Sequence, residues 1–189
     1  MSIADRRAQF TERVIRQTYL EMLAEMPAGK ISVTALCKRA DINRSTFYLH
    51  YQDCAELLET LGAELAERMC AQIADMFAGD KAMHLGMVAM MNPAFLQNAD
   101  DRNVFLSEGS HCAERIVAWA KETTLESWRG RSHLTDNQIC LLFTYITNGC
   151  LALTKAANSG ELNLTAEEDF QLVFKMITEG LHSVIEKLP

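Results

Sequence analysis

SVTALCKRADINRSTFYLHYQDCAELL, residues Ser32 to Leu58, decides the fold of this 189-residue chain. Its first part places an apolar residue at every third or fourth position, which predicts a short helix from Ser32 to about Ala40. A turn follows at residues 41–43, and a second short helix is expected over residues 44–50. Ser32 and Asn43 are good N-caps for the two helices. Two short helices joined by a tight turn predict a helix-turn-helix.

The second of these helices has two different faces. Phe47 and Tyr51, four residues apart, are expected to face the core. The other side chains are mostly hydrogen-bonding groups. Their exposure on so short a helix is typical of the recognition helix of a DNA-binding protein. With the start of the first helix added, the residues predicted to contact DNA are Ser32, Thr34, Arg44, Ser45, Thr46, Tyr48, Leu49 and His50. Ordinary solvated surface is the alternative.

The composition predicts an all-α protein. Hydrophobic residues make up 49% of the chain, there are only three prolines, and no run of alternating β-branched residues occurs. We expect about nine helices: an N-terminal three-helix helix-turn-helix head and a C-terminal helical ligand-binding and dimerisation body. The head is assigned to residues 1–53 and the body to 54–189, with a helix over 53–78 as the connection.

The first helix is expected to run from Asp5 to Glu25. Phe10, with three residues at four-residue intervals after it, forms a row that should face the core. Arg16 is assigned to the polar face of this helix, together with Arg6, Arg7 and Arg13.

Charge is unevenly distributed along the chain. The net charge is −7 overall, yet residues 1–53 hold eight Lys/Arg against six Asp/Glu, a net +2, and residues 54–189 hold ten against nineteen, a net −9. The slightly basic part thus coincides with the proposed DNA-binding head. The N-terminus lacks the apolar core of a signal peptide, and the uncharged stretch 137–154 contains many polar residues. A cytoplasmic protein without a membrane span is expected.

The stretch ISVTALCKRADINRSTFYLHYQDCAELLETL resembles the DNA-binding head of the tetracycline-repressor (TetR) family. The matching residues are Leu36, Ala40, Ile42, Thr46, Phe47, Tyr48, His50, Tyr51, Leu57 and Leu58, and the similarity covers roughly residues 10–62. The resemblance implies a homodimeric transcriptional repressor. Its expected partners are a palindromic double-stranded DNA operator and a small-molecule effector that releases the protein from it.

The sequence departs from the family pattern at two places. Asp41 stands where a turn glycine is usual, and Asp tolerates the left-handed backbone that the turn requires. The start of the next helix commonly carries a phosphate-binding lysine, but here the residues are Gln52, Asp53 and Cys54. A weaker grip on phosphate is expected, or compensation from other basic residues of the head, namely Lys38, Arg39 and Arg44.

A methionine-rich segment follows Gly79. Four methionines fall between residues 83 and 91, and such adaptable side chains suit either an apolar ligand pocket or plain core packing. The break at Asn92-Pro93 favours a pocket. The candidate lining residues are His84, Met87, Met91, Phe95, Phe105, His111 and Trp119.

Two apolar helices are expected at the C-terminal end, at about residues 135–157 and 165–188. The capping-box sequences Thr135–Gln138 and Thr165–Glu168 mark their starts. Both helices are apolar on more than one side, and Gly180 would allow a close helix approach. We therefore predict a homodimer through a four-helix bundle, as the resemblance also implies.

Other classes of function have less support. An enzyme is not expected, because no nucleophile elbow, phosphate-binding loop or metal-spaced histidine pair occurs. No cofactor or metal site is expected, although a thiol redox or metal sensor using Cys54 or Cys70 is an alternative, and so is regulation by a protein partner. The six cysteines contain no C-x-x-C pair and read as small core residues of a reduced protein.

Overall fold

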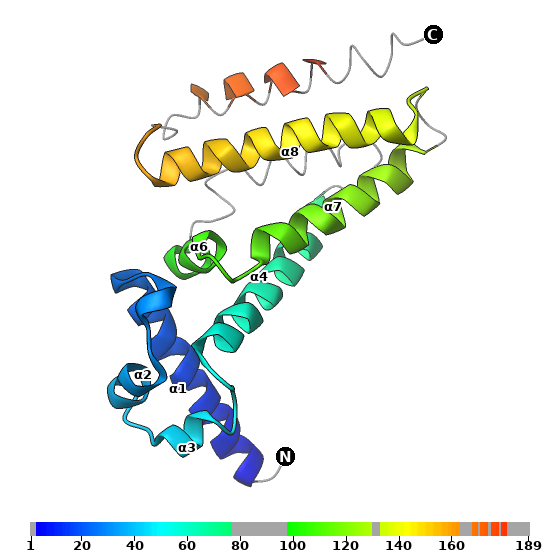
Figure 1. The fold of residues 1–189 in the computed structure, drawn as a ribbon. Coiled ribbons are helices and arrows are strands. Elements are labelled where there is room, and N and C mark those ends of the chain that lie inside the picture. The colour runs from blue at the N-terminus through cyan, green and yellow to red at the C-terminus, as the bar shows by residue number, and fades with distance from the viewer. Residues whose placement is uncertain are drawn as a thin grey trace. The chain divides into compact units, whose positions relative to one another are not determined.

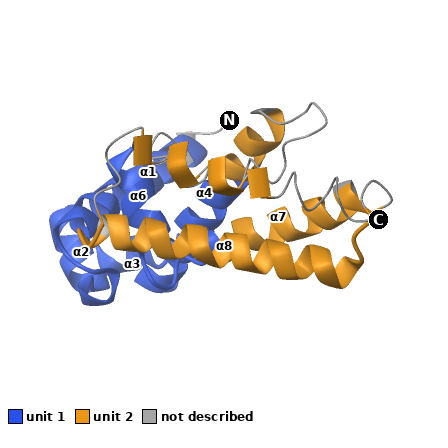
Figure 2. Cartoon of the chain, turned by 90° about the horizontal axis from the view of Figure 1, so that it is seen from above, with its two compact units in different colours: residues 1–67, 97–113 blue, residues 68–96, 114–189 orange. Residues whose placement is uncertain are grey.

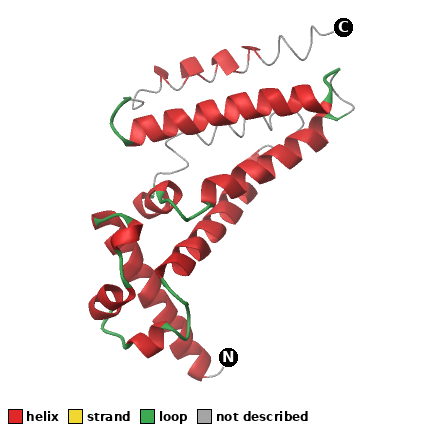
Figure 3. Cartoon of the chain, viewed as in Figure 1, coloured by secondary structure: helices red, strands yellow, loops and turns green. Residues whose placement is uncertain are grey.

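The computed structural model describes residues 3–76, 98–129 and 133–162, together with residues 168–180 except 170, 174 and 178. In these residues every regular element is a helix, and none is a strand (Figure 3). Seven α-helices and one 3-10 helix are present, with further helical residues between 168 and 180. The all-α prediction is confirmed, and the described part holds about eight helices where nine were expected.

The chain forms two compact units (Figure 2). Unit 1 comprises residues 1–67 and 97–113, and unit 2 comprises residues 68–96 and 114–189. The sequence predicts a different division, into residues 1–53 and 54–189, and that division stays a prediction. Unit 1 contains the predicted head together with the first half of the connecting helix and a later segment.

Unit 1 is built on a long first helix (Figure 1). Its elements are α1 (Ile3–Glu25), η1 (Ala28–Lys30), α2 (Val33–Arg39), α3 (Arg44–Phe47), the first part of α4 (Cys54–Met76) and α6 (Ala99–Leu106). α1 packs against both α2 and α6, and α2 packs against α3. Ile15, Leu36, Phe47 and Leu57 are completely buried, so one apolar core holds the short helices in place.

Phe10 does not belong to this core, contrary to the sequence prediction. Its side chain is 59% exposed, and the guanidinium of Arg13 lies over its ring, 5.3 Å from the centroid. The buried part of α1 begins at Ile15, so the first residue of the predicted row lies beyond the elements that cover the helix. Periodicity identifies the face of a helix, but it does not tell how far along the axis that face is covered.

Gly62 on α4 lies in contact with the turn that follows α6. A Cβ atom at this position would stand 2.0 Å from the backbone oxygen of Ser110. Ser110 is itself buried, and the turn uses left-handed backbone at Gly109 (φ 88°) and His111 (φ 50°). The backbone of α4 and this turn therefore pack together without a side chain between them.

Unit 2 contains the rest of α4, most of α7 (Cys112–Trp128) and all of α8 (Asp136–Asn158). Phe143 of α8 packs with Ala120 of α7, and Ile139 packs with Trp128. Ile177, in the last helical stretch, adds to the second of these clusters.

The predicted capping box at the start of α8 is confirmed. The Thr135 hydroxyl accepts from the Gln138 amide at 3.3 Å, and the Gln138 side chain accepts from the Thr135 amide at 2.8 Å. The second predicted box, at 165–168, lies mostly outside the described residues.

Replacing Gly62 with alanine should destabilise the protein by about 1–3 kcal/mol, because the new methyl group meets backbone that cannot turn away. Alanine's better helix propensity, worth about 1 kcal/mol, offsets only part of that cost. Chemical denaturation followed by circular dichroism measures the change. Glu67→Ala, at an exposed position of the same helix, is the control and should stay within about 0.5 kcal/mol. Equal stability of the two variants would contradict the close approach.

Candidate nucleic-acid interface

The start of α2 is capped by its own N-terminal residue. The Ser32 hydroxyl accepts from the backbone amide of Ala35 at 3.2 Å, as predicted for an N-cap. Ser32 and Thr34 are exposed. Free amides and hydroxyls at an exposed helix start can donate to a phosphate.

The turn between α2 and α3 depends on left-handed backbone at Asp41. Its φ is 53°, and the amide of the next residue, Ile42, donates to the carbonyl of Cys37 at 3.0 Å. This is a hydrogen-bonded C-terminal cap of the kind glycine usually makes. The expectation for Asp41 is met.

The helix α3 is shorter than predicted. It covers only Arg44–Phe47, one turn, and residues 48–50 continue as hydrogen-bonded turns. Asn43 occupies the N-cap position, but its side chain makes no capping hydrogen bond. A single turn has little stability of its own, so packing must hold it. Phe47 provides that packing, because it is fully buried and its ring contacts the ring of Tyr51, with centroids 6.0 Å apart.

The polar face of this segment is presented to solvent. Tyr48 is 49% exposed and Leu49 is 83% exposed, while Arg44 and Ser45 are also exposed. The other two predicted residues, Thr46 and His50, are half-buried. All eight predicted DNA-contacting residues are thus at least partly accessible, and all lie in unit 1. Contact with DNA itself stays a prediction.

Arg44 and Tyr48 form a pair at the exposed surface. An Nη2 hydrogen of Arg44 is donated to the Tyr48 hydroxyl at 3.0 Å, and the guanidinium carbon lies 5.8 Å from the centre of the ring. Tyr48 also stands edge-on to the buried ring of Phe47, 5.7 Å between centroids. The core therefore orients Tyr48, and Tyr48 orients the guanidinium. A planar group with several free donors at this position suits guanine or a phosphate.

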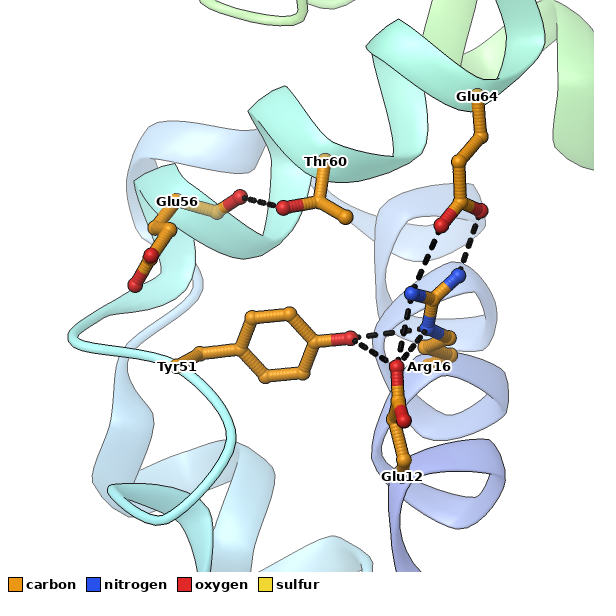
Figure 4. A network of polar contacts seen from close by, with 6 residues as sticks. All are labelled: Glu12, Arg16, Tyr51, Glu56, Thr60 and Glu64. Carbon is orange, nitrogen blue, oxygen red and sulfur yellow. Dashed lines mark hydrogen bonds and ion pairs between the residues drawn. The ribbon is translucent and has the colours of Figure 1, made fainter. Parts of the chain in front are cut away.

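Arg16 joins three elements of unit 1 through a polar network that the sequence prediction missed (Figure 4). Its guanidinium makes a bidentate pair with Glu64 of α4, at 2.6 and 2.9 Å. Its Nε donates to the Tyr51 hydroxyl at 2.8 Å, and this hydroxyl donates to Glu12 at 3.1 Å. Tyr51 ends the segment that carries the exposed face. α1 therefore fixes both that segment and the middle of the long helix α4.

Burial decides the protonation of Tyr51. Removal from water raises the pKa of its phenol to about 12, although the neighbouring Arg16 acts in the opposite direction. The hydroxyl consequently keeps its proton and can donate to Glu12 while it accepts from Arg16. Sequence spacing gives no signal of this network, because its members are 35 and 48 residues apart.

The start of α4 is acidic, and its backbone amides already donate to carboxylates of the same segment. Asp53 accepts from the amides of Ala55 and Glu56, both at 2.8 Å, and Glu56 accepts from the amide of Gln52. These carboxylates take up the amides that a phosphate would use at a helix start. At the ends of α2 and α1, both Nη atoms of Arg39 bind Glu25, at 2.6 and 2.7 Å. Of the basic residues expected to compensate, Arg39 is thus engaged with a carboxylate.

The residues predicted to line a ligand pocket are divided between the two units and the residues that the structure does not describe. Phe105 is buried in α6 of unit 1, His111 is exposed in the turn before α7, and Trp119 packs beside the Ala120–Phe143 cluster of unit 2. The remaining candidates lie outside the described residues: His84, Met87, Met91 and Phe95. The pocket stays a prediction.

The surroundings of the cysteines indicate that they have a structural role. Burial raises the pKa of Cys54 to about 11, with a further contribution from Asp53, and burial also raises the pKa of Cys70. A thiol that keeps its proton reacts slowly with oxidants, which weighs against the redox alternative. In the part of the chain that the structure describes, no three His, Cys, Asp or Glu side chains come together to hold a metal ion.

Comparison with known proteins places the fold. No family model matches the chain. A stretch of 98 residues, 51% of the chain, is 33% identical to the uncharacterised HTH-type transcriptional regulator YxbF of Bacillus subtilis (strain 168). The match spans only 22% of the length of that relative.

Solved structures match over nearly the whole chain. The fatty acid degradation regulator FadR of Bacillus halodurans aligns with a TM-score of 0.65 and 14% identity, over 90% of this chain and 96% of its own. A TetR family transcription regulator of Marinobacter aquaeolei VT8 aligns with a TM-score of 0.62 and 15% identity, over 93% and 97%. The chain has the fold of these regulators, so the TetR resemblance is confirmed at the level of fold. The prediction of a non-enzymatic protein agrees with these comparisons.

Removing the hydroxyl of Tyr51 should lower the stability of the helix-turn-helix head. Tyr51→Phe deletes the acceptor for Arg16 and the donor to Glu12, and should cost about 1–2 kcal/mol of folding free energy. Tyr48→Phe is the matched control: it removes an exposed hydroxyl and should change stability by less than about 0.5 kcal/mol. Urea denaturation of both variants makes the comparison. A loss in Tyr48→Phe as large as that in Tyr51→Phe would refute the structural role given to the network.

Proposed function

We propose that the chain is a TetR-family transcription regulator that binds a palindromic DNA operator as a homodimer and is released by a small-molecule effector. The exposed face of Arg44, Ser45, Tyr48 and Leu49 carries the proposal; it lies on the one-turn helix α3 and the turn after it, which the buried Phe47 holds in place. Tyr48 and Leu49 are neighbours at this surface, and exposed apolar side chains rimmed by polar ones suit a binding surface. The HTH-type relative and the shared fold support the same assignment.

In the bound state, α3 enters the major groove. Arg44 reads guanine or grips phosphate, and Thr46 contacts a thymine methyl group. Tyr48, His50 and the start of α2 at Ser32 and Thr34 bind the backbone. Since the amides at the start of α4 are taken by Asp53 and Glu56, few phosphate contacts come from there, and non-specific affinity is correspondingly low.

A second copy of the chain is the partner proposed for α8 and the last helix. By length and composition, Asp136–Ala157 of α8 could cross a membrane, with a mean hydropathy of 1.4. Its exposed face, however, places Leu141 and Tyr145 (63% and 77% exposed) among polar side chains such as Thr144 and Asn148. Polar side chains that face lipid are costly, whereas a protein interface tolerates this mixture.

The last helical stretch presents a similar face. Leu172 and Met176, four residues apart, are both largely exposed. Gly180 continues this row, and a Cβ atom placed there would meet nothing within 4 Å. We assign the close helix approach expected at Gly180 to the proposed dimer.

Two heads in such a dimer would meet half-sites about one helical turn apart, roughly 34 Å. An effector bound in the body would change that spacing through α4, and its affinity would be coupled reciprocally to that of DNA. The Gly62–Ser110 contact supports this proposal, since it links α4 directly to the turn between α6 and α7.

Arg44→Ala and Tyr48→Ala should each weaken specific DNA binding by about 1–3 kcal/mol, because Arg44→Ala removes the proposed contact with guanine or phosphate and Tyr48→Ala removes a proposed contact with the DNA backbone. Gel shift and footprinting on the DNA upstream of the protein's own gene would measure it. Arg129→Ala is the matched control, since it also removes one positive charge but lies in unit 2, paired with Asp136 at 2.7 Å. If the wild-type dimer shifts no such DNA at low salt, the function is wrong.

Tyr145→Glu should shift the chain from dimer to monomer, because it places a charge in the proposed apolar interface. Tyr145→Phe keeps the apolar surface and should leave the dimer intact. Sedimentation velocity over a range of concentrations distinguishes the two. A stable dimer of the glutamate variant would move the interface elsewhere.

A further inference from the structure

A cavity of about 370 Å³, partly open to solvent, lies within unit 1 beside the start of α2. It is bounded by the end of α1, the η1 turn, the start of α4 and the turn before α7. Tyr19, Ile31, Val33 and Leu58 supply most of its apolar wall. Its volume falls within the range of small-molecule sites in proteins.

Tyr19 is the residue that marks this cavity as a binding site. Its side chain is only 1% exposed, yet within the described residues the structure gives its hydroxyl no hydrogen-bond partner. Burial raises the pKa of the phenol to about 12, with a smaller contribution from Cys54, so the group stays protonated. Buried hydroxyls in native proteins are nearly always hydrogen-bonded, and an unpaired one is costly. A ligand in the cavity would supply the missing partner.

The charges around the cavity are of one sign. Asp53 and Glu108 are the charged groups among the described lining residues, and no basic residue joins them. Asp53 also caps α4 through the amides of Ala55 and Glu56, so it is held in place. Two carboxylates at the edge of an apolar cavity favour a cation over a neutral molecule and disfavour an anion.

We propose that this cavity binds a small primary amine with an apolar or aromatic body. The body packs between Ile31, Val33 and Leu58, and the ammonium donates to the Asp53 and Glu108 carboxylates and to the Tyr19 hydroxyl oxygen. This site differs from the body pocket predicted around the methionine-rich segment, because none of the residues predicted for that pocket lines it.

The position of the cavity also gives it a regulatory role. Its wall includes Val33 at the start of α2 and Cys54 at the start of α4, the two helices that flank α3 along the chain. A bound amine would fix the spacing of these two helix starts and so alter how α3 is presented. This second step rests on the proposed DNA-binding function, whereas amine binding does not.

Isothermal titration calorimetry on the full-length protein tests the site, with 2-phenylethylamine, 2-phenylethanol and phenylacetate as a charge series on one body. The amine should bind at least about tenfold more tightly than the alcohol, and phenylacetate should not bind. Equal binding of all three, or binding of none, would overturn the assignment.

Three variants locate the binding. Tyr19→Phe should weaken the amine by about fivefold or more while leaving the melting temperature unchanged or higher, since the free protein loses no hydrogen bond. Gly29→Phe should fill the cavity and abolish binding. Gly29→Ala, whose Cβ would meet nothing within 4 Å, should bind normally. A lower melting temperature of Tyr19→Phe would show that the hydroxyl already has a protein partner, and unchanged binding in Gly29→Phe would place the amine elsewhere.

The coupling to DNA is measured separately, as operator affinity with and without saturating 2-phenylethylamine. A change that Gly29→Phe removes would support it. Amine binding with unaltered DNA affinity would overturn the coupling and leave the site standing. A protein that binds the amine but never binds DNA would instead overturn the proposed function.

Discussion

The bidentate pair between Arg16 and Glu64 is the interaction on which the organisation of unit 1 depends. Without it, α1 and α4 would be related mainly by apolar packing, which is non-directional and tolerates sliding. The forked geometry of the guanidinium specifies both distance and orientation. Because Arg16 also binds the Tyr51 hydroxyl, the same side chain positions the end of the segment that carries the candidate interface.

The value of this pair is geometric more than energetic. The Arg16 side chain is about one-quarter exposed and that of Glu64 about half exposed, so water screens much of their attraction. Stability comes instead from buried apolar residues such as Ile15, Leu36 and Phe47. The core holds the elements together, and the polar network selects one arrangement among those that the core permits.

A one-turn helix such as α3 illustrates how far a functional surface depends on its surroundings. Its N-cap side chain makes no hydrogen bond, and four residues cannot sustain a helix alone. Its position is fixed by the buried side chain of Phe47, by the ring of Tyr51 that contacts Phe47, and by the left-handed turn at Asp41 that precedes it in the chain. The side chains that face outward are consequently free of any structural task except for the Arg44–Tyr48 pair, which leaves them available for recognition.

The sequence by itself determined the helical class, the caps at Ser32 and Thr135, the turn at Asp41 and the division of Phe47 and Tyr48 between core and surface. These features are local: periodicity, side-chain capping and backbone preference act over a few residues, so they can be read directly from the order of the residues. Only the tertiary structure decided that Phe10 lies outside the core, that Arg39 is bound to Glu25, that Arg16 joins Glu64 and Tyr51, and that Tyr19 is buried beside a cavity. Each of these depends on which distant segments meet, and the spacing of residues along one helix carries no information about its partners.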